Sequence, residues 1–263
     1  MSVSAGILGA ARWESASYQP VDECIAEEVP VALEYNGISH AVMLATPADL
    51  EDFALGFSLS EGILVHPREL RDVELDESAR GIRLAMEIAS ERFVLLKDRR
   101  RNLAGRTGCG LCGTESLEQV FRALPRVPEG PGLAVERLHD ALRKLAEIQT
   151  LQQRTGGVHA AFWLDDDHAA LREDVGRHNA LDKLIGHLAR RGTDFAAGAA
   201  IITSRASSEM VQKAAALGIP ILAAVSAPTL QAVRLAEALD MTLIGFARGD
   251  HHVVYSHPRR LKG

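Results

Sequence analysis

Ala199-Ala200-Ile201-Ile202-Thr203 opens the stretch of sequence that decides the fold. Strand and helix signals alternate on both sides of it: strands over 158–164, 199–203, 219–225 and 242–246, and helices over 179–190 (ending near Gly192), 207–217 (ending at Gly218) and 229–239. Such alternation favours right-handed crossovers and a mainly parallel sheet. The sequence therefore predicts an α/β fold for this half of the chain.

Polar residues follow three of the predicted strands. They are Ser204-Arg205, Ser226-Ala227-Pro228 and the Ala247-Arg248 that comes after Phe246. Ligands of open α/β sheets bind beyond the carboxyl ends of the strands. We therefore expect a ligand site where these residues meet.

The N-terminal part of the chain carries a hairpin signal and a helix signal. Asn36-Gly37 joins two apolar-rich runs, and both central residues of a type I′ turn need a positive φ. A helix is predicted to begin with Thr46 as its N-cap and to stop at Gly62. Two further strands are predicted over 82–88 and 93–96. These signals predict a small α+β domain.

We expect four segments along the 263 residues. They are a flexible arm over 1–20, where no periodicity is evident, the small α+β domain over 21–98, a mobile cysteine loop over 99–114 and the α/β domain over 115–263. Helices are predicted from near Thr114 to residue 124 and over 135–152, because apolar residues recur there at helical spacing.

Two of the three cysteines lie in one glycine-flanked loop, Gly108-Cys109-Gly110-Leu111-Cys112-Gly113. The loop follows a basic run that consists of Lys97, Arg99, Arg100, Arg101 and Arg106. Nearby cations stabilise a thiolate, which is the reactive form of cysteine. We therefore expect the chemistry of the chain in this loop.

A CxxC pair has several chemical uses. A structural zinc site needs four ligands, and no second CxxC and no histidine at finger spacing supplies them. A thioredoxin-like pair usually opens the first long helix of its domain, whereas this pair lies in mid-chain. In a sulfur carrier one cysteine accepts a sulfane sulfur as a persulfide and the second assists its transfer. Two buried, inert thiols fit poorly with the surrounding glycines and arginines.

Composition limits the function classes. The formal charge of −6 argues against a broad nucleic-acid footprint. The apolar stretches are too short to span a bilayer, and the N-terminus lacks the basic start of a signal peptide. An odd cysteine count with CxxC spacing indicates a reducing compartment. We therefore expect a cytoplasmic protein with no resident metal, no nucleic-acid partner and no membrane association.

The cysteine loop, from Arg106 to Gly113, resembles that of the formate dehydrogenase accessory sulfurtransferase family (FdhD). Further blocks resemble the family in the same order along the chain: 34–37, 44–62, 155–161, 172–183, 204–210 and 245–248. A CxxC alone would be a weak match, whereas the whole set is specific.

The resemblance implies a bacterial or archaeal protein that receives sulfur from a cysteine desulfurase. The sulfur would pass to the molybdenum cofactor, in its bis-molybdopterin guanine dinucleotide form, before this cofactor enters formate dehydrogenase. Cys109 would be the persulfide carrier, with Cys112 as its assistant. The family also implies a homodimer and a C-terminal domain related to cytidine deaminases, a three-layer α/β fold. Deaminase chemistry would not transfer, because the zinc signature is absent here.

The expected cofactor-binding residues come from four places. They are Phe246, Ala247, Arg248, Gly249, Asp250 and His251 near the C-terminus, Ser204 and Arg205 after a strand, and His178 and Asn179 at a helix start. An aromatic ring can stack on guanine, and an arginine fork can bind phosphate. A GDP-like nucleotide would then serve as a surrogate ligand.

Several of these residues also have an ordinary structural explanation. The charged block 172–179 and the serines after Ser204 could serve as helix caps with surface ion pairs. His159, which follows Thr155-Gly156-Gly157, could be a core residue or a site residue. Arg99-Arg100-Arg101 could steer an anion or end a solvated hairpin. Cys24 is expected to be structural, and the segment 257–260 a solvated tail.

Two rival functions stay open. A CxxC oxidoreductase would use the same pair of thiols for disulfide exchange. A cofactor chaperone would bind the guanylyl cofactor and dock to the dehydrogenase without moving sulfur.

Overall fold

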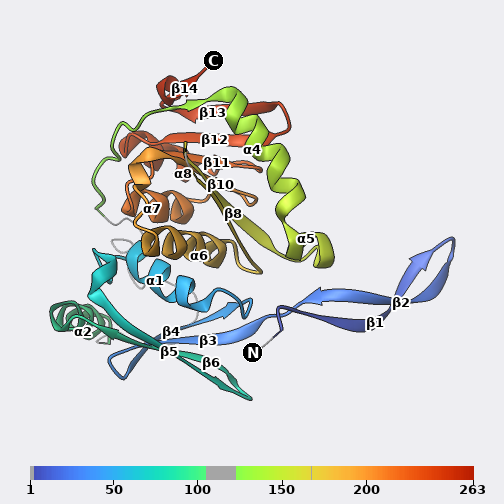
Figure 1. Cartoon of the computed structure of the whole chain (residues 1–263), viewed down its shortest axis with the longest axis horizontal. Coiled ribbons are helices and arrows are strands. Elements are labelled where there is room, and N and C mark those ends of the chain that lie inside the picture. The colour runs from blue at the N-terminus through green and yellow to red at the C-terminus, as the bar shows by residue number, and fades with distance from the viewer. Residues whose placement is uncertain (1–2, 105–122, 167) are drawn as a thin grey trace.

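The computed structural model describes residues 3–104, 123–166 and 168–263 (Figure 1). Strands β1 (Ala5–Glu14) and β2 (Ser17–Ala26) form an antiparallel hairpin that projects from the body of the molecule. The flexible arm predicted over residues 1–20 is therefore wrong for the described residues. Most hairpin side chains are exposed, so no alternation of apolar and polar residues marks its strands.

The small N-terminal domain is a four-stranded sheet covered by one helix. Its strands, in the order β4-β3-β6-β5, are β4 (Ile38–Ala45), β3 (Val29–Tyr35), β6 (Gly81–Ile88) and β5 (Leu70–Ser78). Asn36 and Gly37 have φ values of 47° and 79°, which confirms the predicted turn. The strand predicted over 82–88 is confirmed as β6, while the pattern missed β5, whose side chains are mostly exposed.

Helix α1 (Leu50–Ser60) begins three residues later than predicted. Its N-cap is Asp49, in the left-handed conformation, and not Thr46. Thr46 instead accepts a hydrogen bond from the backbone N–H of Val175 through its hydroxyl. Gly62, at φ 64°, follows the helix and confirms the predicted stop.

The strand predicted over 93–96 is wrong, because these residues lie in helix α2 (Ser90–Ala104). Leu96 is buried while Val94 and Leu95 are exposed, so the short apolar run is one turn of a helix. The same helix contains the first residues of the predicted cysteine loop, which begins at residue 99. Cys109, Cys112 and the predicted helix from near Thr114 up to residue 122 lie outside the described residues, and the last two residues of that predicted helix, 123 and 124, are not helical.

The C-terminal domain is built on a six-stranded sheet. Its strands, in the order β13-β12-β11-β10-β8-β9, are β13 (His251–Ser256), β12 (Thr242–Arg248), β11 (Ile221–Ala224), β10 (Ala199–Ile202), β8 (His159–Leu164) and β9 (Ala169–Asp174). Only β10-β11 and β11-β12 pair in parallel, so the predicted mainly parallel sheet is corrected to a mixed one. The short connections into β9 and β13 form antiparallel hairpins.

Helices cover both faces of this sheet, which confirms the predicted α/β class (Figure 1). One face packs against α6 (Arg177–Arg190), α7 (Ser208–Ala216) and α8 (Leu230–Ala238). The other face packs against α4 (Val135–Ile148), which is followed by α5 (Thr150–Thr155). Along β8, Ala161 and Trp163 face the first layer, while Ala160 and Phe162 face the second. The resemblance to cytidine deaminases stays a prediction.

The C-terminal segment is part of the fold and not the solvated tail that was predicted. Arg260 is buried and donates to the backbone oxygens of Pro128, Glu129 and Asp240. The remaining short elements are β7 (Leu133–Ala134), β14 (Leu261–Lys262), η1 (Pro67–Glu69), η2 (Phe195–Ala197) and η3 (Pro258–Arg260). Pairing of β14 with β7 ties the end of the chain to the start of the C-terminal domain.

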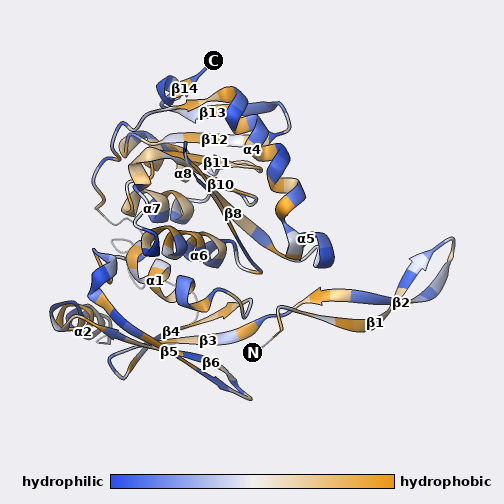
Figure 2. Ribbon diagram, viewed as in Figure 1, coloured by the Kyte–Doolittle hydropathy of each residue, from blue (hydrophilic) through white to orange (hydrophobic). Residues whose placement is uncertain are grey.

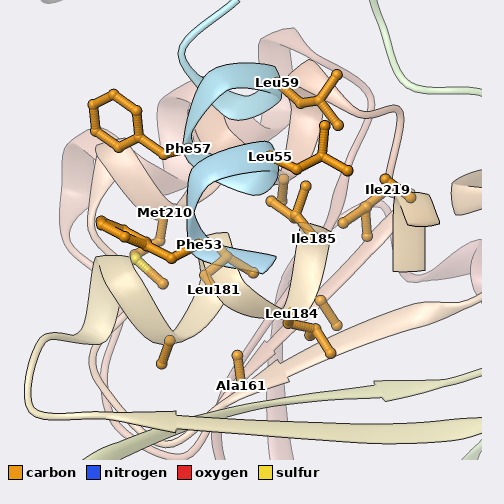
Figure 3. Close-up of a cluster of buried hydrophobic side chains, with 14 of the residues drawn as sticks. Phe53, Leu55, Phe57, Leu59, Ala161, Leu181, Leu184, Ile185, Met210 and Ile219 are labelled. Carbon is orange, nitrogen blue, oxygen red and sulfur yellow. The ribbon is translucent and has the colours of Figure 1, made fainter. Parts of the chain in front are cut away.

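The two domains share one hydrophobic core (Figure 3). Phe53 and Leu55 of α1 lie among Leu181, Leu184 and Ile185 of α6. Where the two helices cross, Gly56 and Gly186 let the backbones approach closely, since a Cβ on Gly56 would lie 1.7 Å from the carbonyl oxygen of Asp182. The helix of the small domain is thereby packed directly against the helical layer of the large one.

Candidate functional site

One edge of the six-stranded sheet collects most of the predicted ligand-binding residues. The strands β9, β10, β11 and β12 all end at this edge, because β9 runs antiparallel to β8 and β8 antiparallel to β10. His159 begins β8 at the same edge, opposite Asp174. Segments separated by up to 90 residues in the sequence thus meet along one line, as expected for a site at strand ends.

Three helices begin at this strand-end edge. The N-caps of α6, α7 and α8 are Gly176, Ser207 and Thr229. The Thr229 side chain accepts a hydrogen bond from the N–H of Ala232, whereas Gly176 and Ser207 provide no side-chain cap. Within the described part of the chain, the buried hydroxyl of Ser207 has no hydrogen-bond partner. The first N–H groups of α6 and α7 are therefore available to an anion.

Phe246 lies two residues before the end of β12 in an uncommon backbone conformation. Its φ is 51°, its side chain is 41% exposed, and its N–H donates to the carbonyl oxygen of Ser226 at 3.2 Å. The pairing register of β12 and β13 shifts between Gly245 and Arg248, which indicates a β-bulge. Bulges at sheet edges redirect side chains. This bulge presents the phenyl ring to solvent at the strand-end edge.

Three arginines supply positive charge beside the helix N-termini. The Nε of Arg248 donates to the carbonyl oxygen of Val225 at 2.8 Å, which holds the side chain along the edge. Arg205 is exposed at the turn after β10. Arg177 is half-buried at the start of α6, and its charge acts on both His159 and His178. Guanidinium groups with helix N-termini form a surface that can bind phosphate.

His159 and His178 at this edge are held in the neutral form. Burial and the charge of Arg177 lower the pKa of His178, against the opposing effect of Glu209, whose Oε2 lies 2.8 Å from Nε2. Burial and Arg177 also lower the pKa of His159, with Asp174 opposing. At neutral pH the two imidazoles therefore act as hydrogen-bonding groups and not as cations.

Asn179 has a structural role in this arrangement. It is buried, and its Nδ2 donates to the carbonyl oxygen of Leu44 at 2.8 Å and to Oδ1 of Asp174 at 3.0 Å. These bonds connect the two domains and occupy the amide. Asn179 therefore has a structural role at the start of α6, and its contact with a ligand stays a prediction.

The other residues predicted to bind the cofactor are either buried or lie at the turn between β12 and β13. The side chains of Ala247 and Ser204 are buried, and the Ser204 hydroxyl donates to the carbonyl oxygen of Arg205 at 3.1 Å. Gly249 forms the turn between β12 and β13 at φ 54°, and Asp250 beside it pairs with Arg143 of α4. His251 is exposed on β13 opposite Arg248.

The expected cofactor-binding residues did not include Arg177, Ser207 or Thr229, although Arg177 and Ser207 lie in the blocks 172–179 and 204–208 that the sequence offered as possible ligand-binding segments. Each of them begins a helix directly after a strand end or its loop, which is the signal that would have found them. In residues 3–104, 123–166 and 168–263, no group of three or more metal-ligating side chains occurs, and no helix is long and apolar enough to cross a membrane.

A cavity of about 1050 Å³ lies between the two domains at the opposite ends of α6 and α7. The carboxyl ends of these helices carry partial negative charge, which disfavours phosphate. Of the arginines that line the cavity, Arg190 already pairs with Glu51 at 2.7 Å. Fold and site together therefore define a mixed α/β protein whose strand-end edge is suited to a phosphorylated ligand.

Comparison with known proteins assigns the chain to a family. The model of the FdhD/NarQ family matches residues 26–262. The chain therefore belongs to the FdhD/NarQ family.

Curated relatives resemble the chain over nearly its whole length. Sulfur carrier protein FdhD of Cupriavidus necator is 60% identical over 253 residues, which is 95% of this chain and 88% of the relative. Sulfur carrier protein FdhD of Variovorax paradoxus is 58% identical, over 91% of this chain and 87% of the relative. A crystal structure from Desulfotalea psychrophila, described as a formate dehydrogenase accessory protein, has the same fold, with a TM-score of 0.80 at 23% identity over 99% of this chain and 100% of that chain.

Proposed function

We propose that this chain is a sulfurtransferase that carries sulfur to the molybdenum cofactor of a formate dehydrogenase. Cys109 would take the sulfur as a persulfide from a cysteine desulfurase and deliver it to bis-molybdopterin guanine dinucleotide before the cofactor is inserted. The observation that carries the proposal is membership of the FdhD/NarQ family together with the close relatives named as sulfur carriers. A cytoplasmic location and a homodimer are part of the same proposal.

The proposed chemistry is a pair of exchanges at sulfur. The Cys109 thiolate attacks the outer sulfur of the desulfurase persulfide, the S–S bond of that persulfide breaks, and the desulfurase cysteine leaves as a thiolate. In the release step, the Cys112 thiolate attacks Sγ of Cys109 and the outer sulfur leaves as sulfide. This step forms a Cys109–Cys112 disulfide, which a thiol reductant must reduce before the next cycle.

The strand-end edge supports binding of the substrate cofactor through its guanine nucleotide parts. The N-termini of α6 and α7, with Arg205 and Arg248, supply N–H groups and charge for a pyrophosphate. The exposed ring of Phe246 offers a face for the guanine. The chemistry of this donor set fits a nucleotide.

Mass spectrometry of the chain after incubation with a cysteine desulfurase and cysteine tests the transfer. We expect one added sulfur atom on Cys109, lost in Cys109→Ala and retained in Cys112→Ala. Cys24→Ala is the matched control and should behave as the unchanged chain. No added sulfur in Cys112→Ala, where the release step cannot occur, would favour the oxidoreductase. Normal formate dehydrogenase maturation with Cys109→Ala would favour the chaperone.

Calorimetry with GDP tests the site itself. Arg248→Ala should weaken GDP binding about tenfold or more, because a charge-assisted hydrogen bond to phosphate contributes about 1.5–3 kcal/mol. Arg80→Ala, at the exposed β5–β6 turn, is the matched control and should leave the affinity unchanged. Equal affinities for all three proteins would contradict binding at the strand-end edge.

A further inference from the structure

The β1–β2 hairpin exposes an unusual amount of apolar surface. Ile7, Leu8 and Trp13 are 78%, 64% and 61% exposed, and the hairpin stands away from the body of the molecule (Figures 1 and 2). A two-stranded hairpin alone in water is marginally stable at best. Exposed apolar surface of this kind marks an interaction site.

The turn of the hairpin determines which backbone groups face outward. Ser15 and Ala16 have φ values of 51° and 63°, as in a two-residue type I′ turn, so Glu14 and Ser17 form a hydrogen-bonded pair. Hydrogen-bonded and non-hydrogen-bonded pairs then alternate. The residues of β1 whose N–H and C=O groups face away from β2 are Ala5, Ile7, Gly9, Ala11 and Trp13.

The two outer edges of the hairpin differ in their protection. On β2, Pro20 lies opposite Ala11 and presents no N–H outward, and Asp22 adds a charge two residues later. The base of β2 is also covered by α5, where Nη2 of Arg154 lies 3.8 Å from Sγ of Cys24. Natural sheet edges are protected by proline, charge or covering segments. Within the described residues β1 pairs with β2 alone, contains no proline, and carries its charges only towards the turn, where Arg12 is paired with Glu23 of β2.

We propose that the outer edge of β1 pairs antiparallel with the same edge of a second copy of this chain. The pairing is centred on Gly9 and gives a four-stranded sheet in the order β2-β1-β1-β2. With a twofold axis through Gly9, residue i of one copy lies opposite residue 18 − i of the other. Odd-numbered residues therefore lie opposite odd-numbered residues, so the outward N–H and C=O groups of one copy face those of the other.

Side-chain size and charge support a second copy of the chain as the partner, and they support this register. Trp13 lies opposite the partner's Ala5, Ile7 opposite the partner's Ala11, and Leu8 opposite the partner's Ala10, so each large side chain meets a small one. Arg12 lies opposite the partner's Gly6, so no like charges face each other. Identical surfaces that complement themselves are the feature of a twofold interface. The hairpin ends at residue 26, where the match to the family model begins, so the inference is argued from the hairpin's own geometry and adds an interface to the homodimer of the proposed function.

Disulfide cross-linking tests the register. In a full-length chain with Cys24, Cys109 and Cys112 changed to serine, Gly9→Cys should form an intermolecular disulfide, because hydrogen-bonded antiparallel Cα atoms lie about 5.5 Å apart. Asp22→Cys is the matched control, since Asp22 lies opposite Gly9 on β2. In the proposed sheet the two copies of residue 22 would be about 14 Å apart, too far for a disulfide.

Sedimentation of full-length variants tests the association. Ala11→Pro removes an outward N–H without affecting the β1–β2 ladder, so it should weaken the dimer about tenfold or more. Asp22→Pro makes the same change on the protected edge and should leave the dimer unchanged. A chain that is monomeric at micromolar concentrations, a dimer that Ala11→Pro does not weaken, or cross-linking at residue 22 in place of residue 9 would each overturn the proposal.

Discussion

Phe246 is the residue whose backbone conformation the fold alone does not explain. A bulky residue at a φ of 51° is strained by about 1–2 kcal/mol, and its side chain is half-exposed instead of packed in the core. Strain of this kind is often retained where a side chain has a function. We therefore expect Phe246 to serve binding at the expense of stability.

Phe246→Gly tests this expectation. Glycine relieves the strain, so the free energy of unfolding should stay the same or rise by up to about 1 kcal/mol, while GDP affinity should fall several-fold. Urea unfolding and calorimetry measure the two quantities. Phe195→Gly, which removes a ring packed on Trp163, is the contrasting control and should destabilise the chain. A clear loss of stability with unchanged GDP affinity in Phe246→Gly would show that the ring is structural.

Asp182 makes stability depend on pH. It is buried on α6, and burial raises its pKa to about 6, although Lys213 and the Ser60 hydroxyl oppose the shift. The folded chain therefore binds a proton between about pH 4 and 6 that the unfolded chain releases. The stability from this proton is fully present below pH 4 and is lost as the pH rises through 6.

Asp182→Asn should remove this dependence. The difference in unfolding free energy between Asp182→Asn and the unchanged chain should change by about 2 kcal/mol between pH 4 and 7, in favour of the asparagine variant at the higher pH. Urea titrations at a series of pH values measure it. Asp98→Asn serves as a comparison at another aspartate. A difference that is constant over this range would mean that Asp182 does not titrate there.

At the scale of elements, the crossing of α1 and α6 depends on two glycines. A Cβ on Gly186 would lie 1.9 Å from the carbonyl oxygen of Asp52, and backbone atoms cannot move aside as a flexible side chain can. Gly186→Ala should therefore lower the free energy of unfolding by at least about 3 kcal/mol, the upper part of the range for overpacking. Gly6→Ala is the matched control, because a Cβ there meets nothing within 4 Å. Thermal unfolding that is equal for both variants would contradict the close crossing.

The elements that the sequence predicted are those with a buried face. β10, β11, β12 and the two helices between them, α7 and α8, have apolar positions at the right period, because their side chains pack in the core. The pattern missed β1, β2 and β5 because their side chains are mostly exposed on both faces. The same reasoning explains the site: strand ends and helix starts located Ser204, Phe246 and His178, whereas the contacts of Asn179 with the other domain depend on tertiary structure.

For the whole molecule, a buried polar network joins the two domains. Lys183, fully buried on α6, lies 2.6 Å from Asp174 and donates to the carbonyl oxygen of Thr46 at 2.9 Å. The backbone N–H of Thr46 donates in turn to Asp174 at 3.0 Å. Together with the shared hydrophobic core, this network predicts that both domains unfold as one cooperative unit.

Lys183→Met tests whether the two domains unfold together, because it leaves the carboxylate of Asp174 buried without its cation. Breaking a buried ion pair costs about 3–5 kcal/mol. Native-state hydrogen exchange should show the same loss of protection in β3 and β6 of the small domain as in β10 and β11 of the large one. Lys144→Met, on the exposed side of α4, is the matched control and should change neither. A loss confined to the small domain would mean that it opens by itself, and the two domains would then be separate folding units that merely pack together.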